Sequence, residues 1–451
     1  MKRIVIAGAG LAGALAAIFL ARRGFEVEVF ESRQDPRTSE KQEGRSINLA
    51  LSNRGIAALR KVGMEEIVGQ LAIPMHGRMI HPENGKPRLL PYSGRKNEFI
   101  NSVSRSDLNI ALINKADSFD NVKIHFSNPC LGFDCKQKVL LTKGNEEITA
   151  DAFIAADGAG SQIRRSLLLG GVERFDYMQS WLAHGYKELT IPPRNGDFAL
   201  EPNALHIWPR HSYMMIALPN LDRSFTCTLF LSHSKSGQTP GFDQFQSAES
   251  VKAFFKAEFE DAFDLMPGLV EDFFNHPTGN LGTVRCSPWH VEDRLLLIGD
   301  AAHAIVPFYG QGMNCAFEDV RILDEMIEQH EGDWQQLFQK FESERKPNTD
   351  AIAELAEENF YEMRDATADP VFIRKRELET KLESLYQDFY SKYSMVTFRD
   401  DLPYSVAKVL GNEQDRLLTE IAASCEDIGQ LDLEEVRSKI RQFYDKAAAL
   451  K

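Results

Sequence analysis

Three glycines near the start of the chain have the spacing of a phosphate-binding turn. Gly8, Gly10 and Gly13 form the pattern G-x-G-x-x-G between a strand-like and a helix-like segment. Such glycines permit a tight turn, a close approach of the backbone to a pyrophosphate, and close packing of the following helix. That helix starts with Leu11 and Ala12, so its free N-terminal amides would point at the phosphates. The pattern predicts a dinucleotide site.

An acidic residue at the end of the next strand-like segment strengthens this prediction. Glu31 follows Gly13 by 18 residues, and a carboxylate in that place accepts the hydroxyls of an adenosine ribose. It also disfavours a ribose phosphate, so the sequence predicts FAD or NAD rather than NADP at this site. An unrelated glycine turn is the alternative interpretation of the bare pattern. The strand, helix and acid around the glycines argue against that alternative.

A second glycine loop favours FAD over NAD. An apolar segment leads to Asp300, which is placed to accept a ribityl hydroxyl, and the loop after it opens a further helix. Free amides at that helix start would face the pyrimidine edge of a flavin and stabilise its anionic reduced form. The residues of this loop predicted to bind FAD are Pro307, Gly310, Gly312, Met313 and Asn314.

A third segment, around Asp157 and Gly158, also ends an apolar strand-like stretch. Taken alone, it is as typical of a helix-capping turn as of a cofactor site. His303 is interpreted as a hydrogen-bonded structural histidine rather than as a catalytic base.

The elements around these motifs predict an α/β fold. Strand-like segments at residues 3–7 and 26–30 flank a helical pattern at 11–23, which is a βαβ unit. Strand patterns dominate the middle of the chain, and its last third is mostly helical, with Pro347 and Pro370 as expected helix breaks. We expect an FAD-binding domain at 1–175, an inserted β-rich substrate domain at 176–288, a second FAD-binding segment at 289–365, and a helical region at 366–451.

Composition and charge argue against several other classes of protein. The 52 Lys and Arg residues against 66 Asp and Glu residues give a net charge of −14, whereas nucleic-acid binding needs clustered cations. The six cysteines include no C-x-x-C pair, so we expect neither a disulfide framework nor a metal site. Residues 4–21 carry no charge, but glycines interrupt them. We therefore expect no signal peptide, no membrane anchor and a cytoplasmic location.

The three motifs in this order resemble those of the single-component FAD-dependent aromatic hydroxylases. Within that group, five blocks spread over nearly the whole chain closely resemble the kynurenine 3-monooxygenase family. These blocks are residues 44–52 (GRSINLALS), 77–81 (GRMIH), 307–314 (PFYGQGMN), 359–365 (NFYEMRD) and 393–398 (YSMVTF).

This resemblance implies a Rossmann-like FAD-binding domain with an inserted β-sheet substrate domain and a helical C-terminal region. It implies NADPH- and dioxygen-dependent hydroxylation of L-kynurenine to 3-hydroxy-L-kynurenine through a flavin 4a-hydroperoxide, in tryptophan degradation toward quinolinate and NAD. FAD is then the cofactor, which carries the hard chemistry, and NADPH is the co-substrate.

The resemblance also assigns site residues. It places Arg78 and Tyr92 at the kynurenine carboxylate, which suits a planar guanidinium and a hydroxyl donor; without it, such a pair is more typical of an ordinary surface. The other implied substrate contacts are Asn359, Glu362, Met363, Tyr393, Leu205, Met214, Leu218, Phe230, Pro307, Phe308 and Tyr309. Among these, the apolar residues of the inserted strands fit an ordinary core nearly as well. Further implied FAD contacts are Arg45, Ala50, Arg105 and Leu131.

Two features depart from the family pattern. Tyr309 stands where we expect His or Phe, which alters the local hydrogen bonding, and the hydrophobic C-terminal anchor of eukaryotic relatives is missing. The second departure implies a soluble enzyme of the bacterial type. Three alternative functions share the same parts: an FAD-dependent hydroxylase of another aromatic acid, a flavin-dependent reductase, and a non-catalytic flavoprotein.

Overall fold

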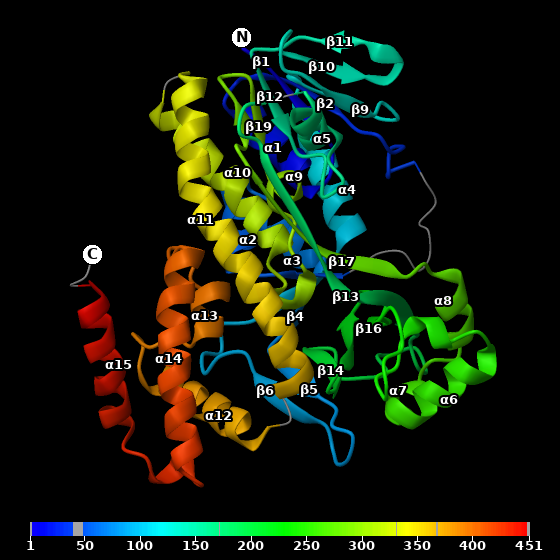
Figure 1. Ribbon diagram of the computed structural model, residues 1–451, viewed down its shortest axis with the longest axis vertical. Coiled ribbons are helices and arrows are strands. Elements are labelled where there is room, and N and C mark those ends of the chain that lie inside the picture. Colours follow the sequence, from blue (N-terminus) through cyan, green and yellow to red (C-terminus); the bar gives the residue numbers. More distant parts are fainter. Residues whose placement is uncertain (1, 39–47, 171, 331, 367–368, 449–451) are drawn as a thin grey trace. The chain divides into compact units, whose positions relative to one another are not determined.

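The computed structural model describes residues 2–38, 48–170, 172–330, 332–366 and 369–448 (Figure 1). The chain forms two compact units. The first comprises Met1–Ala72, Val103–Leu182 and Leu281–Ala356, and the second comprises Ile73–Ser102, Ala183–Asn280 and Glu357–Lys451. Each unit is built around its own large sheet.

The sheet of the first unit has the strand order β18-β19-β12-β1-β2-β8. All neighbouring strands are parallel except the edge pair β18 and β19. The strands are β1 (Arg3–Ala7), β2 (Glu26–Phe30), β8 (Val122–His125), β12 (Ala152–Ala155), β18 (His290–Val291) and β19 (Leu295–Leu297). The βαβ unit expected from the sequence is therefore present, and its crossover is α1 (Leu11–Arg22).

Helix α1 lies inside the first unit because it is apolar on all sides. Its residues from Gly13 to Ala21 are all buried, and it packs against α4 and α10 (Figure 1). The helices of this unit are α2 (Asn53–Lys61), α3 (Glu65–Gln70), α4 (Arg105–Asp117), α5 (Gln162–Leu169), α9 (Asp300–His303), α10 (Gly312–Gln329) and most of α11 (Trp334–Tyr361). Shorter strands are β3 (Asn48–Leu51), β9 (Cys130–Asp134), β10 (Val139–Thr142) and β11 (Glu147–Ile148).

The second unit contains a mainly antiparallel sheet with the strand order β17-β13-β16-β15-β14-β5-β6. The strands of this sheet are β5 (Gly77–Ile80), β6 (Arg88–Pro91), β13 (Asp176–Ile191), β14 (Ala204–Arg210), β15 (Tyr213–Pro219), β16 (Phe225–Ser232) and β17 (Gly279–Ser287). Residues 176–182 of β13 and 281–287 of β17 belong to the first unit. The short strands β4 (Ala72–Met75) and β7 (Ile100–Ser104) lie where the chain passes from one unit to the other. Strand β5 pairs in parallel with β14 although more than 120 residues separate them in the sequence.

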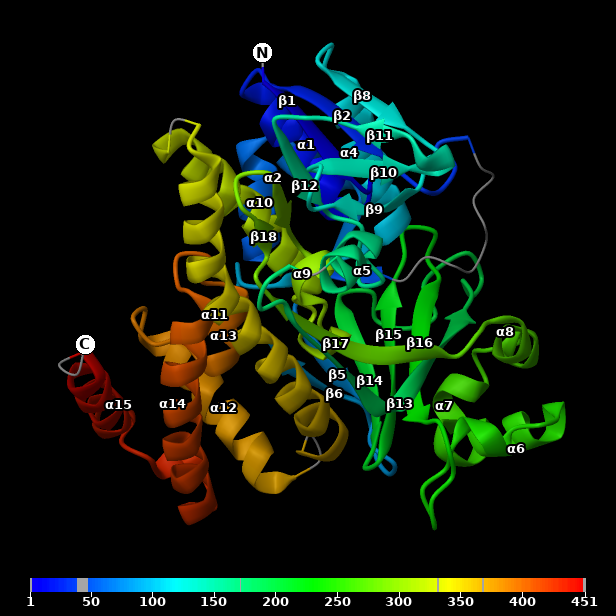
Figure 2. The ribbon, with the colours of Figure 1, turned by 45° about the horizontal axis from the view of Figure 1, so that its top comes forward.

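Two groups of helices complete the second unit. Helices α6 (Ala248–Glu258), α7 (Glu260–Phe263) and α8 (Leu269–Asn275) share a hydrophobic core with one face of the sheet (Figure 2). Helices α12 (Pro370–Leu385), α13 (Lys392–Thr397), α14 (Tyr404–Ser424) and α15 (Leu433–Ala448) form the C-terminal group, in which α12, α13 and α15 all pack on α14.

The two proline expectations had different outcomes. Pro370 is the first residue of α12, as expected. The expectation for Pro347 was wrong, because α11 continues through it. Its neighbour Arg345 is buried and fixed by two carboxylates, so tertiary packing offsets the backbone hydrogen bond that a proline cannot make.

Candidate functional site

Two of the three glycines in the first turn are required by the protein itself. Gly8 has a φ of +97°, and a Cβ at this position would lie 2.6 Å from the carbonyl oxygen of Ala156. A Cβ at Gly13 would lie 1.9 Å from the carbonyl oxygen of Gly8. Any side chain at either position would therefore collide with backbone atoms.

The middle glycine has no such explanation within the protein. Gly10 has a φ of −67°, which any residue adopts, and among the described residues other than its chain neighbours a Cβ there would meet no heavy atom within 4 Å. It precedes α1, whose first residues are Leu11 and Ala12 and whose N-terminus has no side-chain cap. Open space beside a free helix N-terminus is what the phosphates of a dinucleotide need.

Glu31 holds the glycine turn through its carboxylate. The carboxylate is buried and accepts a hydrogen bond from the backbone amide of Ala9 at 2.8 Å. It also accepts bonds from the amide and the guanidinium of Arg33, at 2.9 and 2.8 Å. Burial alone would raise its pKa, but the bonds from Arg33 and Ala9 hold the pKa of Glu31 below its usual value. The group is thus an anion with a fixed orientation beside the predicted ribose position.

Sequence reasoning missed two residues of this turn. Arg33 pairs with Glu31, and Asn109 of α4 donates from Nδ2 to the Ala9 carbonyl at 2.9 Å. The spacing of Arg33 from Glu31 could have indicated the pair. Nothing in the sequence marks Asn109, which lies within an ordinary helical pattern.

Arg164 of α5 links two of the predicted cofactor segments. Its buried guanidinium donates to the Ala301 carbonyl at 2.7 Å and to the Ala159 carbonyl. In the first of these segments, Asp157 is half-buried, and burial of its carboxyl group raises its pKa. Its Oδ2 accepts from the amide of Ile163 at 3.2 Å, whereas its Oδ1 has no hydrogen-bond partner among the described residues. Gly158 follows with a φ of +82°.

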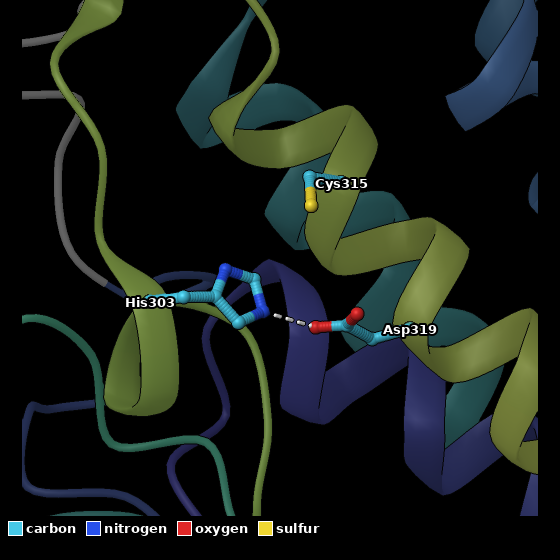
Figure 3. Close-up of side chains that lie close together, drawn as sticks. All are labelled: His303, Cys315 and Asp319. Carbon is cyan, nitrogen blue, oxygen red and sulfur yellow. Dashed lines mark hydrogen bonds and ion pairs between the residues drawn. The ribbon is translucent and has the colours of Figure 1, made fainter. Parts of the chain in front are cut away.

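The segment around Asp300 is fixed by Asp319 of α10 (Figure 3). Asp319 is fully buried and accepts from the amide of Gly299 at 3.0 Å and from His303 Nε2 at 2.6 Å. The guanidinium of Arg345 donates to the other carboxylate oxygen at 2.7 Å. Burial would raise the pKa of Asp319, but the charges of His303 and Arg345 hold it below its usual value. His303 is therefore hydrogen-bonded within a buried network, as the sequence interpretation expected.

The group formed by His303, Cys315 and Asp319 has the residue types of a metal site, since their ligand atoms lie within 4.8 Å of one another. Arg345 already contacts two of the three, reaching Cys315 Sγ at 3.4 Å. Burial raises the pKa of the Cys315 thiol well above its usual value. A protonated thiol beside a buried guanidinium is a poor ligand for a cation, so the group acts as an ion-pair network.

The loop of residues 307–314 gives its glycines and its asparagine different roles. Gly310 has a φ of +67°, and a Cβ there would lie 2.8 Å from the Ala50 Cβ. Asn314 donates from Nδ2 to the carbonyls of Ala50 and Gly310, both at 2.8 Å, and accepts from the amide of Ser52 at 2.9 Å. Its side chain thus ties the loop to β3, which leaves the backbone amide as the atom that could face a flavin.

The start of α10 remains open in the same way as that of α1. In the described part of the chain, the helix has no side-chain cap, and the nearest atom that a Cβ at Gly312 would meet is Ile305 Cγ1 at 3.7 Å. Met313 is the second residue of the helix. Free amides with room in front of them are what the FAD prediction for this loop requires.

The other predicted residues of the first unit have varied surroundings. Asp300 is the first residue of α9 and is half-buried; Arg105 is exposed at the start of α4; and Leu131 of β9 has an exposed fraction of 47%. In the turn before Gly310, Pro307 is exposed, whereas Phe308 and Tyr309 are buried. Arg45 lies outside the described residues.

In the second unit, the strand register brings five of the predicted substrate residues to one face of the sheet. Arg78 of β5 stands opposite Leu205 of β14, and Met214 of β15 stands opposite Phe230 of β16. Leu218 lies four residues after Met214 on β15, so both side chains point to the same side of the strand. Side chains alternate along a strand and paired residues point the same way, so all five lie on one face, opposite the core shared with α6, α7 and α8.

Arg78 lies in an aromatic and largely buried environment. Its guanidinium carbon is 5.0 Å from the ring centre of Tyr393 and 5.8 Å from that of Tyr92, and the two rings stack at 5.1 Å. Arg78 Nε and the Tyr92 hydroxyl are buried and have no hydrogen-bond partner among the described residues. Burial raises the pKa of Tyr92 well above its usual value, so the hydroxyl stays a neutral donor. The unpaired Nε of the Arg78 cation and the unpaired Tyr92 hydroxyl are both donors, which predicts an anionic ligand.

The end of α11 adds an acidic group. Glu362 begins a π-helical turn, Glu362–Ala366, which packs against β14, and its Oε1 lies 3.8 Å from Arg78 Nη1. Asn359 donates to the sulfur of Met363 at 3.3 Å. The structure therefore brings Arg78, Tyr92, Tyr393 and Glu362 together, with Asn359 and Met363 paired at the end of the same helix.

Comparison with known proteins identifies the family. Residues 1–356 match the model of the FAD binding domain family. The chain is 42% identical over 453 residues to the kynurenine 3-monooxygenase of Legionella pneumophila (strain Corby), covering 100% of this chain and 99% of the relative. The kynurenine 3-monooxygenase of Dictyostelium discoideum is also 42% identical, with 99% of both chains covered. This chain belongs to the kynurenine 3-monooxygenase family. The resemblance found in the sequence motifs is thereby confirmed.

Solved structures of lower identity share the fold of this family member. The tetrameric form of 2-methyl-3-hydroxypyridine-5-carboxylic acid oxygenase matches with a TM-score of 0.66 at 20% identity, covering 87% of this chain and 99% of that one. Pseudomonas aeruginosa PqsL in complex with 2-aminobenzoylacetate matches with a TM-score of 0.63 at 18% identity, covering 81% and 100%. The predicted α/β class with an FAD-binding domain is thus confirmed.

In this member of the kynurenine 3-monooxygenase family, the described residues leave space and unpaired polar groups where FAD is predicted to bind. Gly10 leaves space that no protein atom fills, α1 and α10 begin without side-chain caps, and Asp157 presents a buried oxygen without a partner. Among the described residues, no helix has both the length and the apolar character that crossing a membrane requires.

Proposed function

We propose that this chain uses FAD, NADPH and dioxygen to hydroxylate L-kynurenine to 3-hydroxy-L-kynurenine. Membership of the kynurenine 3-monooxygenase family supports the reaction. The observation in the structure that carries the proposal is the buried edge of Arg78, whose Nε has no hydrogen-bond partner among the described residues and lies in the same aromatic cluster as the unpaired Tyr92 hydroxyl.

The charges around Arg78 suit the amino-acid end of kynurenine. Arg78 offers a planar cation to the α-carboxylate, and the Tyr92 hydroxyl offers a further donor. Glu362, 3.8 Å from Arg78, supplies the opposite charge for the α-ammonium group. A zwitterion therefore meets a matching pair of charges, and Tyr393 and Asn359 complete the polar end in this proposal.

The face of the sheet that carries Arg78 suits the aromatic end. Met214 and Phe230 are at most 2% exposed, and Leu218 is 7% exposed. These side chains and Leu205 supply an apolar surface beside Arg78, as a flat aminobenzoyl ring requires. The roles predicted for Met363, Pro307, Phe308 and Tyr309 along the ring remain part of this proposal.

When bound, FAD accepts reducing equivalents from NADPH and activates dioxygen for transfer of one oxygen atom to the ring. The residues of the chain have the complementary tasks. Gly10 and the uncapped starts of α1 and α10 receive phosphate and flavin atoms, and Glu31 orients the ribose. Arg78 and Tyr92 orient the substrate, and the apolar face excludes water from the ring. The proposal requires no side chain as a covalent nucleophile and assigns no general base.

We also propose a cytoplasmic location. All six cysteines have free thiols, as is usual in a reducing compartment, and NADPH is available there. L-kynurenine, NADPH and dioxygen are the proposed partners.

The proposal is tested with the purified FAD-containing protein. NADPH is added with and without kynurenine, flavin bleaching is followed without oxygen, and hydroxylated product is measured by mass spectrometry in air. We expect kynurenine to accelerate bleaching and to yield 3-hydroxykynurenine. A parallel set with aromatic acids that lack the α-amino group decides between kynurenine and another aromatic acid. Rapid bleaching without any hydroxylated product would instead indicate a reductase, and no bleaching a non-catalytic flavoprotein.

A further inference from the structure

The loop that follows Tyr92 is bound tightly to α12. A Cβ at Gly94 would lie 2.3 Å from the carbonyl oxygen of Thr380 and 2.7 Å from the amide nitrogen of Ser384. Only a glycine lets the loop backbone lie directly on the helix backbone. The position of Tyr92, two residues earlier, therefore depends on how this loop is held.

Glu383 of α12 holds two separate segments with one carboxylate. Its Oε2 accepts from the amide of Gly94 at 3.0 Å, and its Oε1 accepts from the amide of Ser391 at 2.9 Å. The side chain is 3% exposed, so both bonds lie in a low-dielectric interior where hydrogen bonds to a charged acceptor are strong. Ser391 caps α13 and precedes Tyr393 by two residues.

Arg95, the next residue of the loop, binds it to the segment that follows α12. Its guanidinium donates to the carbonyls of Tyr386 and Gln387, both at 3.2 Å, and to that of Phe389 at 2.5 Å. It also lies over the ring of Tyr390, 4.1 Å from the ring centre. Glu383 and Arg95 together form what we call the clamp, which joins the loop after Tyr92 to the segment that leads into α13.

The clamp has an evident consequence for the two tyrosines. Tyr92 directly follows β6 and Tyr393 lies in α13, about 300 residues later, yet their rings stack at 5.1 Å with an angle of 10° between the planes. Glu383 bonds to a residue two positions from each of them. We infer that the clamp of Glu383 and Arg95 positions Tyr92 and Tyr393 around Arg78, so that the clamp determines recognition of the substrate carboxylate without touching the substrate. This inference rests on the proposed function.

The test compares Glu383→Gln with wild type and with Glu377→Gln. Glu377 lies on the exposed side of the same helix and forms a surface ion pair with Arg88, so it is the matched control. A glutamine keeps the shape of Glu383 but presents an NH₂ group to one of the two amides. The dissociation constants of kynurenine and of its decarboxylated amine are measured by flavin absorbance, together with kcat, FAD content and melting temperature.

We expect Glu383→Gln to raise the kynurenine Kd about tenfold, the factor for one hydrogen bond to a charged group. The Kd of the amine, kcat at saturation and FAD content should stay near wild type, and Glu377→Gln should change nothing. In a double-mutant cycle with Tyr92→Phe, the two effects should be less than additive, because Glu383 acts through Tyr92.

Additive effects, or a lower melting temperature with an unchanged preference for kynurenine over the amine, would overturn the positioning role. If Glu383→Gln does not fold, Arg95→Gln releases the same loop and must show the same loss of preference, or the inference is wrong. Failure of the proposed function has a different signature, because wild-type protein would then itself show no preference for kynurenine.

Discussion

Replacing Arg78 by alanine should weaken kynurenine binding by roughly two to three and a half powers of ten. Arg78 has two distinct edges: Nη1 faces Glu362 at 3.8 Å, whereas Nε is buried without a partner among the described residues. A carboxylate on the Nε edge would gain two charge-assisted bonds of about 1.5 to 3 kcal/mol each. Because Glu362 competes for the same cation, we expect a net loss of about 3 to 5 kcal/mol, as for other buried pairs that lose one partner.

The assay is a flavin absorbance titration of each variant with kynurenine and with its decarboxylated amine. Wild type should prefer kynurenine strongly, Arg78→Ala should show little preference, and Arg78→Lys should recover only part, because an ammonium group lacks the planar fork. Arg78→Met fills the space without the charge and separates the loss of the cation from a cavity effect. FAD content should not change in any variant. The reasoning is refuted if Arg78→Ala binds kynurenine normally or keeps the full preference over the amine.

Further predictions concern the first unit. Gly10→Ala should leave the melting temperature of the apoprotein unchanged but weaken FAD binding about tenfold or more. Gly13→Ala, whose Cβ would lie 1.9 Å from a backbone oxygen, should yield little folded protein. If Gly10→Ala binds FAD as tightly as wild type, the ligand does not approach the backbone closely at Gly10. Glu31→Gln should weaken the free energy of FAD binding by about 1.5 to 3 kcal/mol, the contribution of one hydrogen bond to a charged group. Since the pKa of Glu31 is lowered in the folded state, its contribution to stability is complete above about pH 4.3 and is lost as the pH falls through the folded-state pKa. Wild type should therefore lose more stability in acid than Glu31→Gln, and parallel acid curves would contradict this. Asp319→Asn should lower the free energy of unfolding, measured in guanidinium chloride, by about 3 kcal/mol or more, because it leaves the buried Arg345 without one of its carboxylate partners. Glu325→Gln, which removes a surface ion pair on the same helix, should lower it by under about 1 kcal/mol. Similar losses in both variants would argue against the network.

The first 30 residues show where sequence reasoning succeeds. The strand Arg3–Ala7, the helix from Leu11 and the strand Glu26–Phe30 were predicted to within one residue. Their signals are local: an apolar run, glycines at fixed positions, and alternation along the second strand. The family was likewise recognisable because its motifs are contiguous blocks.

The strand that carries Arg78 and the one that leads into Tyr92 show where it fails. Strand β5 has four residues, too few for a period to be recognised, and its partner β14 lies more than 120 residues away. The helices α6, α7 and α8 inside the expected β-rich segment were not predicted either. The roles of Glu383 and Arg345 depend on contacts between distant elements, and a sequence pattern does not contain such distances. The side-chain bonds of Asn314 were not predicted for the same reason, because they join it to three backbone groups, two of which lie more than 250 residues away.

The alternation of side chains along β14 and β15 has an evolutionary consequence. Residues of the proposed substrate face, such as Leu205 and Met214, alternate with residues of the helix-covered core such as Trp208 and Met215. Inserting or deleting one residue would exchange the two sets and destroy both. Substitution at every second position changes the proposed binding surface and leaves the core intact. New substrate preferences in this lineage should therefore arise by point substitution within these strands, with length changes confined to the turns between them.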